Sequence, residues 1–441
     1  MSRPAVWLAA ILLSCTTQES APATLQPTPR SRAAETVQTP EGSRPPTAME
    51  RNAIDRLAQD AEAVRGLRFH HDVQVKIQTP DEIASHLDDE LDDEDIEKAK
   101  LVYVTLGLLP EAIDLRTLLR GVMGEQVLGF YDTRGHLLVL RDEIAHVLIR
   151  SPNSADAAEA RVVIVHEFVH ALQDQQLELG ALAEVERDSD ADNALQSLIE
   201  GDATLAMIFY AAAQARVSPE EVLDGPLLDR LVQGLSAPAG DDALGQSPAI
   251  LRYTLVTPYI AGVRFVRELY RDGRWPEVDA AFRTLPASSE QVLHPETYLR
   301  GEEPDAIALP AFPALDAVWE TVEEDTLGEL ELSVFLGRGT PDEIDPAAAA
   351  GWGGDRLRIY RKPDGTGAAV WFTSWDSEAE AEEAEAAAAR DSTQRLVRQG
   401  RALLILRGVD ADLAPSVLES FAIFAAELPE SPPRRPSTIA P

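Results

Sequence analysis

Two histidines four residues apart, with a glutamate directly after the first, stand in the stretch "VVIVHEFVHALQDQ". In a helix, positions i and i+4 share one face about one turn apart. The imidazoles of His166 and His170 could therefore both bind one zinc ion at the ~2.0–2.1 Å that zinc requires. Glu167, beside them, is placed to take a proton from the water that zinc would activate. The alternative is a buried core helix whose histidines hydrogen-bond to neighbouring backbone groups.

A catalytic zinc site also needs a third protein ligand and one open position for water. The stretch "LIEGDATL" offers Glu200, for which the alternative is an exposed acid on a helix. Gly201 and Ala203 are small and would let this segment approach the first helix closely. Asp202 or Asp174 could accept a hydrogen bond from the second nitrogen of a ligand histidine and so fix its tautomer.

The combination of H-E-x-x-H with "E-G-x-A" on a later helix resembles the gluzincin branch of zinc metallopeptidases. The resemblance implies one Zn²⁺ ion held by His166, His170 and Glu200, with Glu167 as the general base. In more detail, "HEFVHALQDQ", "IEGDAT", "GFYD", "SSEQVLHPETYL" and "GWGGDR" resemble a poorly characterised set of lipoprotein-like metallopeptidases from bacteria and archaea. This likeness covers most of residues 50–425.

Peptide hydrolysis also requires a group that stabilises the oxyanion formed when water adds to the carbonyl. Gluzincins commonly take a tyrosine or histidine for this role from the helical half beyond the ligands. Two stretches here qualify, "SSEQVLHPETYL" with His294 and Tyr298 and "TPYIAGVRFV" with Tyr259. His294 is the first candidate, because a histidine in a polar, turn-like stretch is less easily explained by packing, and Tyr259 is the second. For each, a structural role is the alternative. The other histidines show no ligand spacing that fits the site: His70, His71, His86, His136 and His146.

Several elements must position these side chains. Apolar spacing predicts a helix from about residue 155 to 179 for the H-E-x-x-H motif and another from about 190 to 215 for Glu200. Before them, "EQVLGFYDTRGHLLVLRDE" has the pattern of a β-hairpin. Its first strand could pair with an extended substrate by strand addition, or the hairpin could simply cover the core.

The predicted fold class is α+β. A mainly helical, zincin-like metallopeptidase domain with a small N-terminal sheet is expected over residues 49–336. The strand-like stretches "RLRIYRK", "GAAVWFTSW" and "ALLILRG" alternate with helical ones and predict a small C-terminal α+β domain of unknown role over 350–428. Residues 429–441 read as a disordered tail.

The N-terminus has the pattern of a lipoprotein signal. Arg3 precedes "AVWLAAILL", which has the length of a signal-peptide core and is too short to span a membrane. "LLSC" resembles a lipoprotein box and places the chain's only cysteine, Cys15, where lipidation occurs. Residues 1–15 are then the signal, and 16–48, rich in Pro, Ser, Thr and Gln, a disordered tether. An ordinary cleaved signal with an incidental cysteine is the alternative.

The formal net charge of -36 argues against a nucleic-acid partner and against general attraction to anionic lipid. These features together predict a zinc-dependent peptidase with one Zn²⁺ per chain and a peptide or protein substrate. A lipid on the N-terminus would be its only membrane contact and would hold it at the cell envelope, on the extracytoplasmic side of a bacterial membrane. Two alternatives remain: a non-catalytic envelope lipoprotein that keeps the fold to bind a partner, and a zinc hydrolase acting on non-peptide amides.

Overall fold

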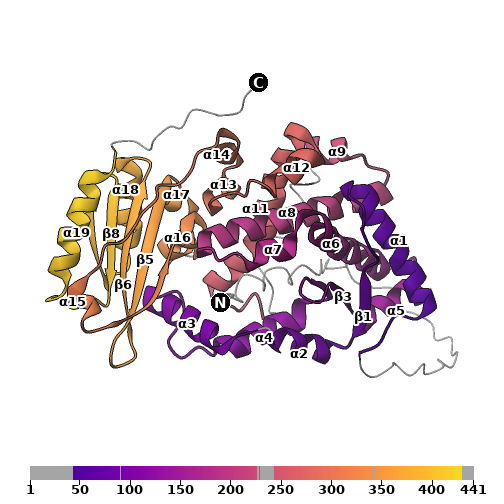
Figure 1. Ribbon diagram of the computed structural model, residues 1–441, viewed down its shortest axis with the longest axis horizontal. Helices are drawn as coiled ribbons and strands as arrows, with labels where there is room; N and C mark the ends of the chain where they lie inside the picture. The colour runs from indigo at the N-terminus through magenta and orange to yellow at the C-terminus, as the bar shows by residue number, and fades with distance from the viewer. Residues whose placement is uncertain (1–42, 90, 226–227, 229–242, 341–342, 430–441) are drawn as a thin grey trace, which may run out of the picture.

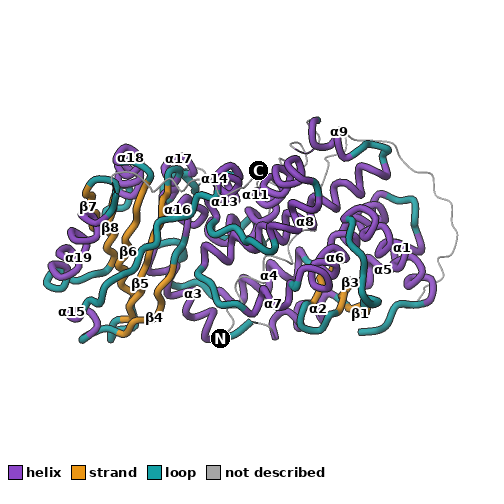
Figure 2. Tube along the Cα trace, turned by 45° about the horizontal axis from the view of Figure 1, so that its top comes forward, coloured by secondary structure: helices purple, strands orange, loops and turns teal. Residues whose placement is uncertain are grey.

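The computed structural model describes residues 43–429 except 90, 226–227, 229–242 and 341–342 (Figures 1 and 2). The first elements are α1 (Ala48–Arg65), β1 (Gln74–Gln78), α2 (Pro80–Asp89), α3 (Asp93–Leu106), α4 (Leu115–Gln126), β2 (Gly129–Asp132), β3 (Leu137–Arg141) and α5 (Asp142–Arg150). The central helices are α6 (Ala155–Leu177), α7 (Leu179–Glu184), α8 (Ser189–Gln214), α9 (Pro219–Asp224), α11 (Ala249–Gly273), α12 (Trp275–Ala281), α13 (Ser289–Leu293) and α14 (Pro295–Arg300). The last elements are α15 (Pro313–Asp316), β4 (Glu320–Asp325), α16 (Gly328–Gly337), α17 (Pro346–Ala349), β5 (Trp352–Arg361), β6 (Gly367–Trp375), α18 (Glu378–Ala388), β7 (Gln394–Gln399), β8 (Ala402–Arg407) and α19 (Ala414–Glu427).

The α+β class is confirmed. Figure 1 shows a small sheet at one end of the molecule and a larger sheet at the other, with α8, α11 and α16 between them. The small sheet has the order β1-β3-β2, in which β1 runs parallel to β3 and β2 antiparallel to it. The predicted hairpin is therefore confirmed as β2 and β3. In this sheet β2 pairs only with β3, and on its other edge the backbone N–H of Tyr131 donates a hydrogen bond to Glu167 of α6, so this edge faces α6.

The larger sheet has the order β4-β5-β6-β8-β7, and all of its neighbouring strands are antiparallel. Alternate residues of its central strands face opposite sides, as strand geometry requires. On one side Trp371 and Ile405 pack against α16 and α18. On the other side Phe372 and Leu404 pack against α15 and α19. Both faces of this sheet are thus covered by helices.

Three helices form the centre of the molecule. Residues 163–173 of α6 are all buried, so this helix is surrounded by protein on every side. Helix α8 lies against both α6 and α11. Ser154 and Asp188 start α6 and α8 by accepting hydrogen bonds from backbone N–H groups of the first turns. These two helices run over the ranges that the sequence predicts to within two residues at each end.

Two boundaries differ from the prediction. Arg44 pairs with Ile77 of β1 through backbone hydrogen bonds, so residues 43–48 belong to the folded part and not to the tether. Strand β4 begins at Glu320, so the C-terminal sheet starts before residue 350. Cys15, the signal segment, the rest of the tether and residues 430–441 lie outside the described residues. Within the described residues, no helix combines the length and the hydrophobicity needed to cross a membrane.

Candidate metal centre

The structure brings His166, His170 and Glu200 together in the interior. Nε2 of His166 lies 3.0 Å from Nε2 of His170, and Oε2 of Glu200 lies 3.2 Å and 3.5 Å from these two nitrogens. The two histidines come from successive turns of α6, and Glu200 comes from the middle of the neighbouring α8. The three residues are 3%, 3% and 0% exposed, so protein encloses them almost completely.

These three atoms have the spacing of metal ligands. Atoms bound tetrahedrally at ~2.0–2.1 Å from one ion lie roughly 3.3 Å apart, close to the distances found here. Oε1 of Glu200 accepts a hydrogen bond of 2.8 Å from Nε2 of Gln196, whereas Oε2 is buried and accepts none. A buried carboxylate oxygen without a hydrogen-bond donor is costly unless a cation lies against it. The group could therefore hold a metal ion.

The charges within the group favour a cation. Burial alone would raise the pKa of Glu200, but His170 and His166 outweigh it and hold this pKa at about 2. Burial likewise opposes a charged His170, but Glu200 raises the pKa of His170 to about 9. Burial lowers the pKa of His166. Without a metal, the ionised Glu200 is thus balanced by a proton on His170, and a metal ion would displace that proton.

Glu167 directly follows the ligand His166 on α6, and its carboxylate contacts the strand β2. Its Oε2 accepts a hydrogen bond of 2.9 Å from the backbone N–H of Tyr131 in β2. Burial raises the pKa of Glu167 to about 8, and the Tyr131 N–H acts in the opposite direction. A carboxyl group with a pKa near neutrality is suited to exchange protons. Through its bond to Tyr131, Glu167 connects α6, which carries the two histidines, with the edge strand β2.

The two candidates for oxyanion stabilisation lie in different places. Tyr259 of α11 is buried, and its ring stacks on that of His166 with the centroids 6.2 Å apart. His294 instead pairs through Nε2 with Oε1 of Glu329, at 3.0 Å. It follows α13, whose first residue, Ser289, bonds to Asp190 at the start of α8. Ten residues of helix, about 15 Å, separate Asp190 from Glu200, so His294 does not join the ligands.

Two sequence-based expectations about neighbours were wrong. Asp174 does not bond to a ligand histidine but accepts hydrogen bonds from Tyr131 and His136. Asp202 reaches His170 only through an intervening glutamine, described below.

A third expectation, that the small residues Gly201 and Ala203 let α8 approach α6 closely, was half right. Ala203 does pack against Val169 of α6. Gly201 instead faces α11, where a Cβ atom would lie 2.2 Å from the carbonyl group of Gly262.

Sequence reasoning missed Gln173, which is fully buried one turn after His170. Its Oε1 lies 2.9 Å from Nδ1 of that histidine. The spacing i, i+3 places the two side chains on one helix face and could have indicated the contact. Gln196, which bonds to Glu200, stands four residues before it on α8 and follows the same rule.

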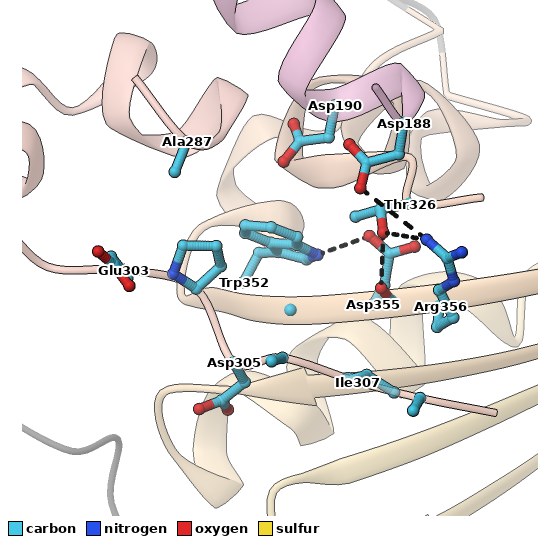
Figure 3. Close-up of a pocket in the computed structure, with 14 residues that line it drawn as sticks. Asp188, Asp190, Ala287, Glu303, Asp305, Ile307, Thr326, Trp352, Asp355 and Arg356 are labelled. Atoms are coloured by element: carbon cyan, nitrogen blue, oxygen red, sulfur yellow. Dashed lines mark hydrogen bonds and ion pairs between the residues drawn. The ribbon is translucent and has the colours of Figure 1, made fainter. Parts of the chain in front are cut away.

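A separate cavity of about 350 Å³ lies between the start of α8, the segment 303–308 and β5 (Figure 3). Asp188, Asp190 and Asp355 are among its lining residues. Asp355 accepts four hydrogen bonds, from the backbone N–H groups of Leu327 and Gly328 and the indole N–H groups of Trp352 and Trp371. This acid therefore joins β5, β6 and α16 structurally. Throughout the described residues, only the group of His166, His170 and Glu200 has three ligand atoms within 4.8 Å of one another.

The fold and the site thus define an α+β protein with a buried group of two histidines and one glutamate. Comparison with known proteins adds a family model described as "Domain of unknown function (DUF8575)", which matches residues 317–402. The match runs from just before β4 to the first residue of β8 and includes none of the three ligand residues. No curated protein and no solved structure matches the chain significantly.

Proposed function

We propose that this chain is a zinc-dependent peptidase of the gluzincin type. The observation that carries the proposal is the spacing of three buried ligand atoms, of which Oε2 of Glu200 accepts no hydrogen bond. Two imidazoles and one carboxylate suit zinc, and three protein ligands leave a fourth position open. A bound zinc ion would supply the Lewis acid that activates water for attack on a peptide carbonyl.

The residues around the group have separate roles in this proposal. Glu167 accepts the proton of the attacking water, and the Tyr131 N–H holds its carboxylate in place. Tyr259 is now the stronger candidate for stabilising the oxyanion, because its ring lies against a ligand histidine while His294 pairs elsewhere. The outer edge of β2 supports a zincin-like arrangement, since it faces the motif helix and could pair with an extended substrate.

The test measures zinc content and peptidase activity on the purified chain. Wild type should carry about one zinc per chain, and His166→Ala and Glu200→Ala should each lose it. Glu167→Gln should keep the zinc but lose roughly 10²–10⁴-fold in kcat, the usual contribution of a general base. His146→Ala, which changes a histidine of α5 outside the group, is the matched control and should behave as wild type.

The outcomes separate the alternatives. Zinc retained in Glu200→Ala would remove this residue as the third ligand. A zinc-loaded wild type that cleaves no peptide of a diverse library, and no protein substrate, would overturn the peptidase and leave a binding protein or a hydrolase of other amides.

Localisation at the cell envelope is part of the same proposal. Cys15 would carry the lipid that holds the chain on the extracytoplasmic side of a bacterial membrane. In a bacterial host, wild type should sediment with membranes, and Cys15→Ser should move to the soluble fraction. Equal distribution of both forms would contradict the lipid anchor.

A further inference from the structure

Gln173 has its hydrogen bonds fixed by the groups on either side of it. Its side-chain nitrogen donates to the carbonyl oxygen of Ile199 at 3.0 Å and to Oδ2 of Asp202 at 2.9 Å. Both partners are acceptors, and an amide can meet two acceptors only with its NH₂ group. The amide oxygen must therefore face the other way, toward His170. The side chain is fully buried, so water cannot replace these partners.

The orientation of the Gln173 amide determines which ring nitrogen of His170 carries the proton. Oε1 of Gln173, 2.9 Å from Nδ1, can only accept a hydrogen bond, so Nδ1 must carry the proton. The second nitrogen, Nε2, is then the one that can give its lone pair to a metal. Nε2 is also the atom that lies among the other ligands, near His166 and Glu200.

Asp202, the acceptor for Gln173, is itself fully buried and is compensated by one cation. Nε of Arg65 lies 2.6 Å from its Oδ1, and this arginine is fully buried too. Nη2 of Arg65 bonds to Asp279 at 2.5 Å, and the guanidinium lies 4.4 Å from the ring centroid of Trp275. Arg65 is the last residue of α1, Trp275 and Asp279 both belong to α12, and Asp202 belongs to α8, so this series of contacts joins three helices.

We propose that Gln173 is a positioning residue that holds His170 with Nδ1 protonated and Nε2 directed at the metal, and that the Asp202–Arg65 ion pair sets the direction of the Gln173 amide. The inference rests on the metal site of the proposed function but not on peptide hydrolysis. Removal of such a partner of a ligand histidine typically weakens metal binding 10–100-fold.

The first experiment compares Gln173→Met with wild type by competition for zinc against a chromophoric chelator. Methionine keeps the length and approximate volume of the side chain but lacks the amide. Zinc should bind roughly 10–100-fold more weakly. The matched control is Gln175→Met on the same helix, where the glutamine bonds to the backbone of His70 and His71 and should not affect zinc. Equal affinity of wild type and Gln173→Met would overturn the proposal.

A second readout follows the proton itself. The buried Nδ1–H of His170 should give a downfield proton resonance that exchanges slowly, both with and without zinc, and it should disappear or shift in Gln173→Met. A purely structural role would leave that resonance unchanged, and its persistence would overturn the proposal. If Gln173→Met does not fold, Gln173→Asn serves the same purpose, because it keeps the amide but withdraws it from His170 by one carbon.

A double-mutant cycle tests the part played by Asp202. Asp202→Asn should weaken zinc binding severalfold in the wild-type background and should have almost no further effect in Gln173→Met. Additive effects would overturn the link between Asp202 and the Gln173 amide.

Failure of the proposed function would give a different result from failure of this inference. Zinc binding without peptidase activity would overturn the function and leave this inference intact. A wild type that binds no zinc would overturn both the function and the metal-directing role of Gln173, and the Nδ1–H resonance would then report only which nitrogen of His170 carries the proton.

Discussion

Tyr259 is the polar aromatic side chain that lies against a ligand histidine, and its hydroxyl is its only chemically active group. If it donates to the developing oxyanion, Tyr259→Phe should lower kcat by roughly 10²–10³-fold, the usual cost of one such donor. Zinc content and KM should stay near the wild-type values, because the ring that stacks on His166 is retained. Steady-state kinetics with a cleavable peptide would measure this. An unchanged kcat would show that Tyr259 only packs against His166 and takes no part in catalysis.

Glu331 in α16 is a buried carboxyl group distant in sequence from the metal ligands. It accepts weak hydrogen bonds from Tyr103, at 3.3 Å, and Asn193, at 3.2 Å. Burial raises the pKa of Glu331 to about 8 from an ordinary value of 4.5, and Asp325 adds to the rise. Between these two values the unfolded chain is ionised while the folded chain keeps its proton. The free energy of unfolding should therefore fall as the pH rises from about 4.5 to 8.

Glu331→Gln should remove this pH dependence, because the amide resembles the protonated acid. At pH 9 the variant should be more stable than wild type by roughly 1–3 kcal/mol, the penalty for a buried polar group without adequate partners. At pH 4.5 the two should be nearly equal. Urea unfolding at both pH values measures the difference, with the exposed Glu419→Gln as control. A wild type that is as stable as the variant at pH 9 would show that Glu331 ionises freely.

At the residue scale, the sequence predicts contacts that are local and misses those that are not. His166 and His170 are one helical turn apart, so their spacing alone predicts that they meet. The bond from Gln173 to Asp202 joins residues 29 positions apart in the sequence, on different helices. No local pattern indicates which helix will lie there. The sequence did not indicate the pairing of His294 for the same reason, because its partner, Glu329, is 35 residues away.

Helices α8 and α11 approach each other most closely where two glycines meet. A Cβ atom on Gly201 would overlap the backbone of Gly262, which cannot move as a flexible side chain would. Gly201→Ala should therefore cost about 1–3 kcal/mol or more of stability. It should also weaken zinc binding, since Glu200 is the adjacent residue.

Gly124→Ala is the matched control for that prediction. Gly124 also lies in a helix, α4, but a Cβ atom there meets nothing within 4 Å. Alanine favours helices more than glycine does, so this variant should be more stable by about 0.5–1 kcal/mol. Thermal unfolding of both variants measures the contrast. Similar effects of the two substitutions would contradict the close contact between α8 and α11.

At the element scale, the sequence predicts buried elements better than edge elements. β5, β6 and β8 have long buried runs that are visible in the apolar pattern. β4, "ETVEED", and β7, "QRLVRQ", are mostly exposed or half-buried and have no clear alternation. They are strands because a neighbour offers them backbone hydrogen bonds, and this depends on the assembled sheet. The predicted start of the C-terminal domain came after β4 for this reason.

The two ends of the molecule share one hydrophobic core. Met123 of α4 and Leu255 of α11 belong to the same cluster as Phe335 of α16 and Trp371 of β6. A core that continues across the predicted boundary between residues 336 and 350 couples the stability of the two parts. The helical part and the larger sheet should therefore unfold together.

Two probes can test this coupling. Four of the six tryptophans lie between residues 319 and 375, so tryptophan fluorescence mainly reports on the larger sheet and its surroundings. Far-UV circular dichroism is dominated by the helices. Both should give one midpoint, and zinc at 100 times its Kd should raise the free energy of unfolding for both by about 2.7 kcal/mol. Separate midpoints, or a zinc effect on one probe alone, would show two independent units.

The near-complete burial of the three ligand side chains also determines how quickly a bound metal could be exchanged. A chelator could reach the ion through the open fourth position, but it could not displace the three protein ligands, whose residues are 0–3% exposed, without a movement of α6 or α8. Local opening of packed helices is much rarer than ligand exchange at an open site. The rate of metal loss should then be set by the protein's own fluctuations and be independent of chelator concentration. Once loaded, the chain would keep the ion it first acquired.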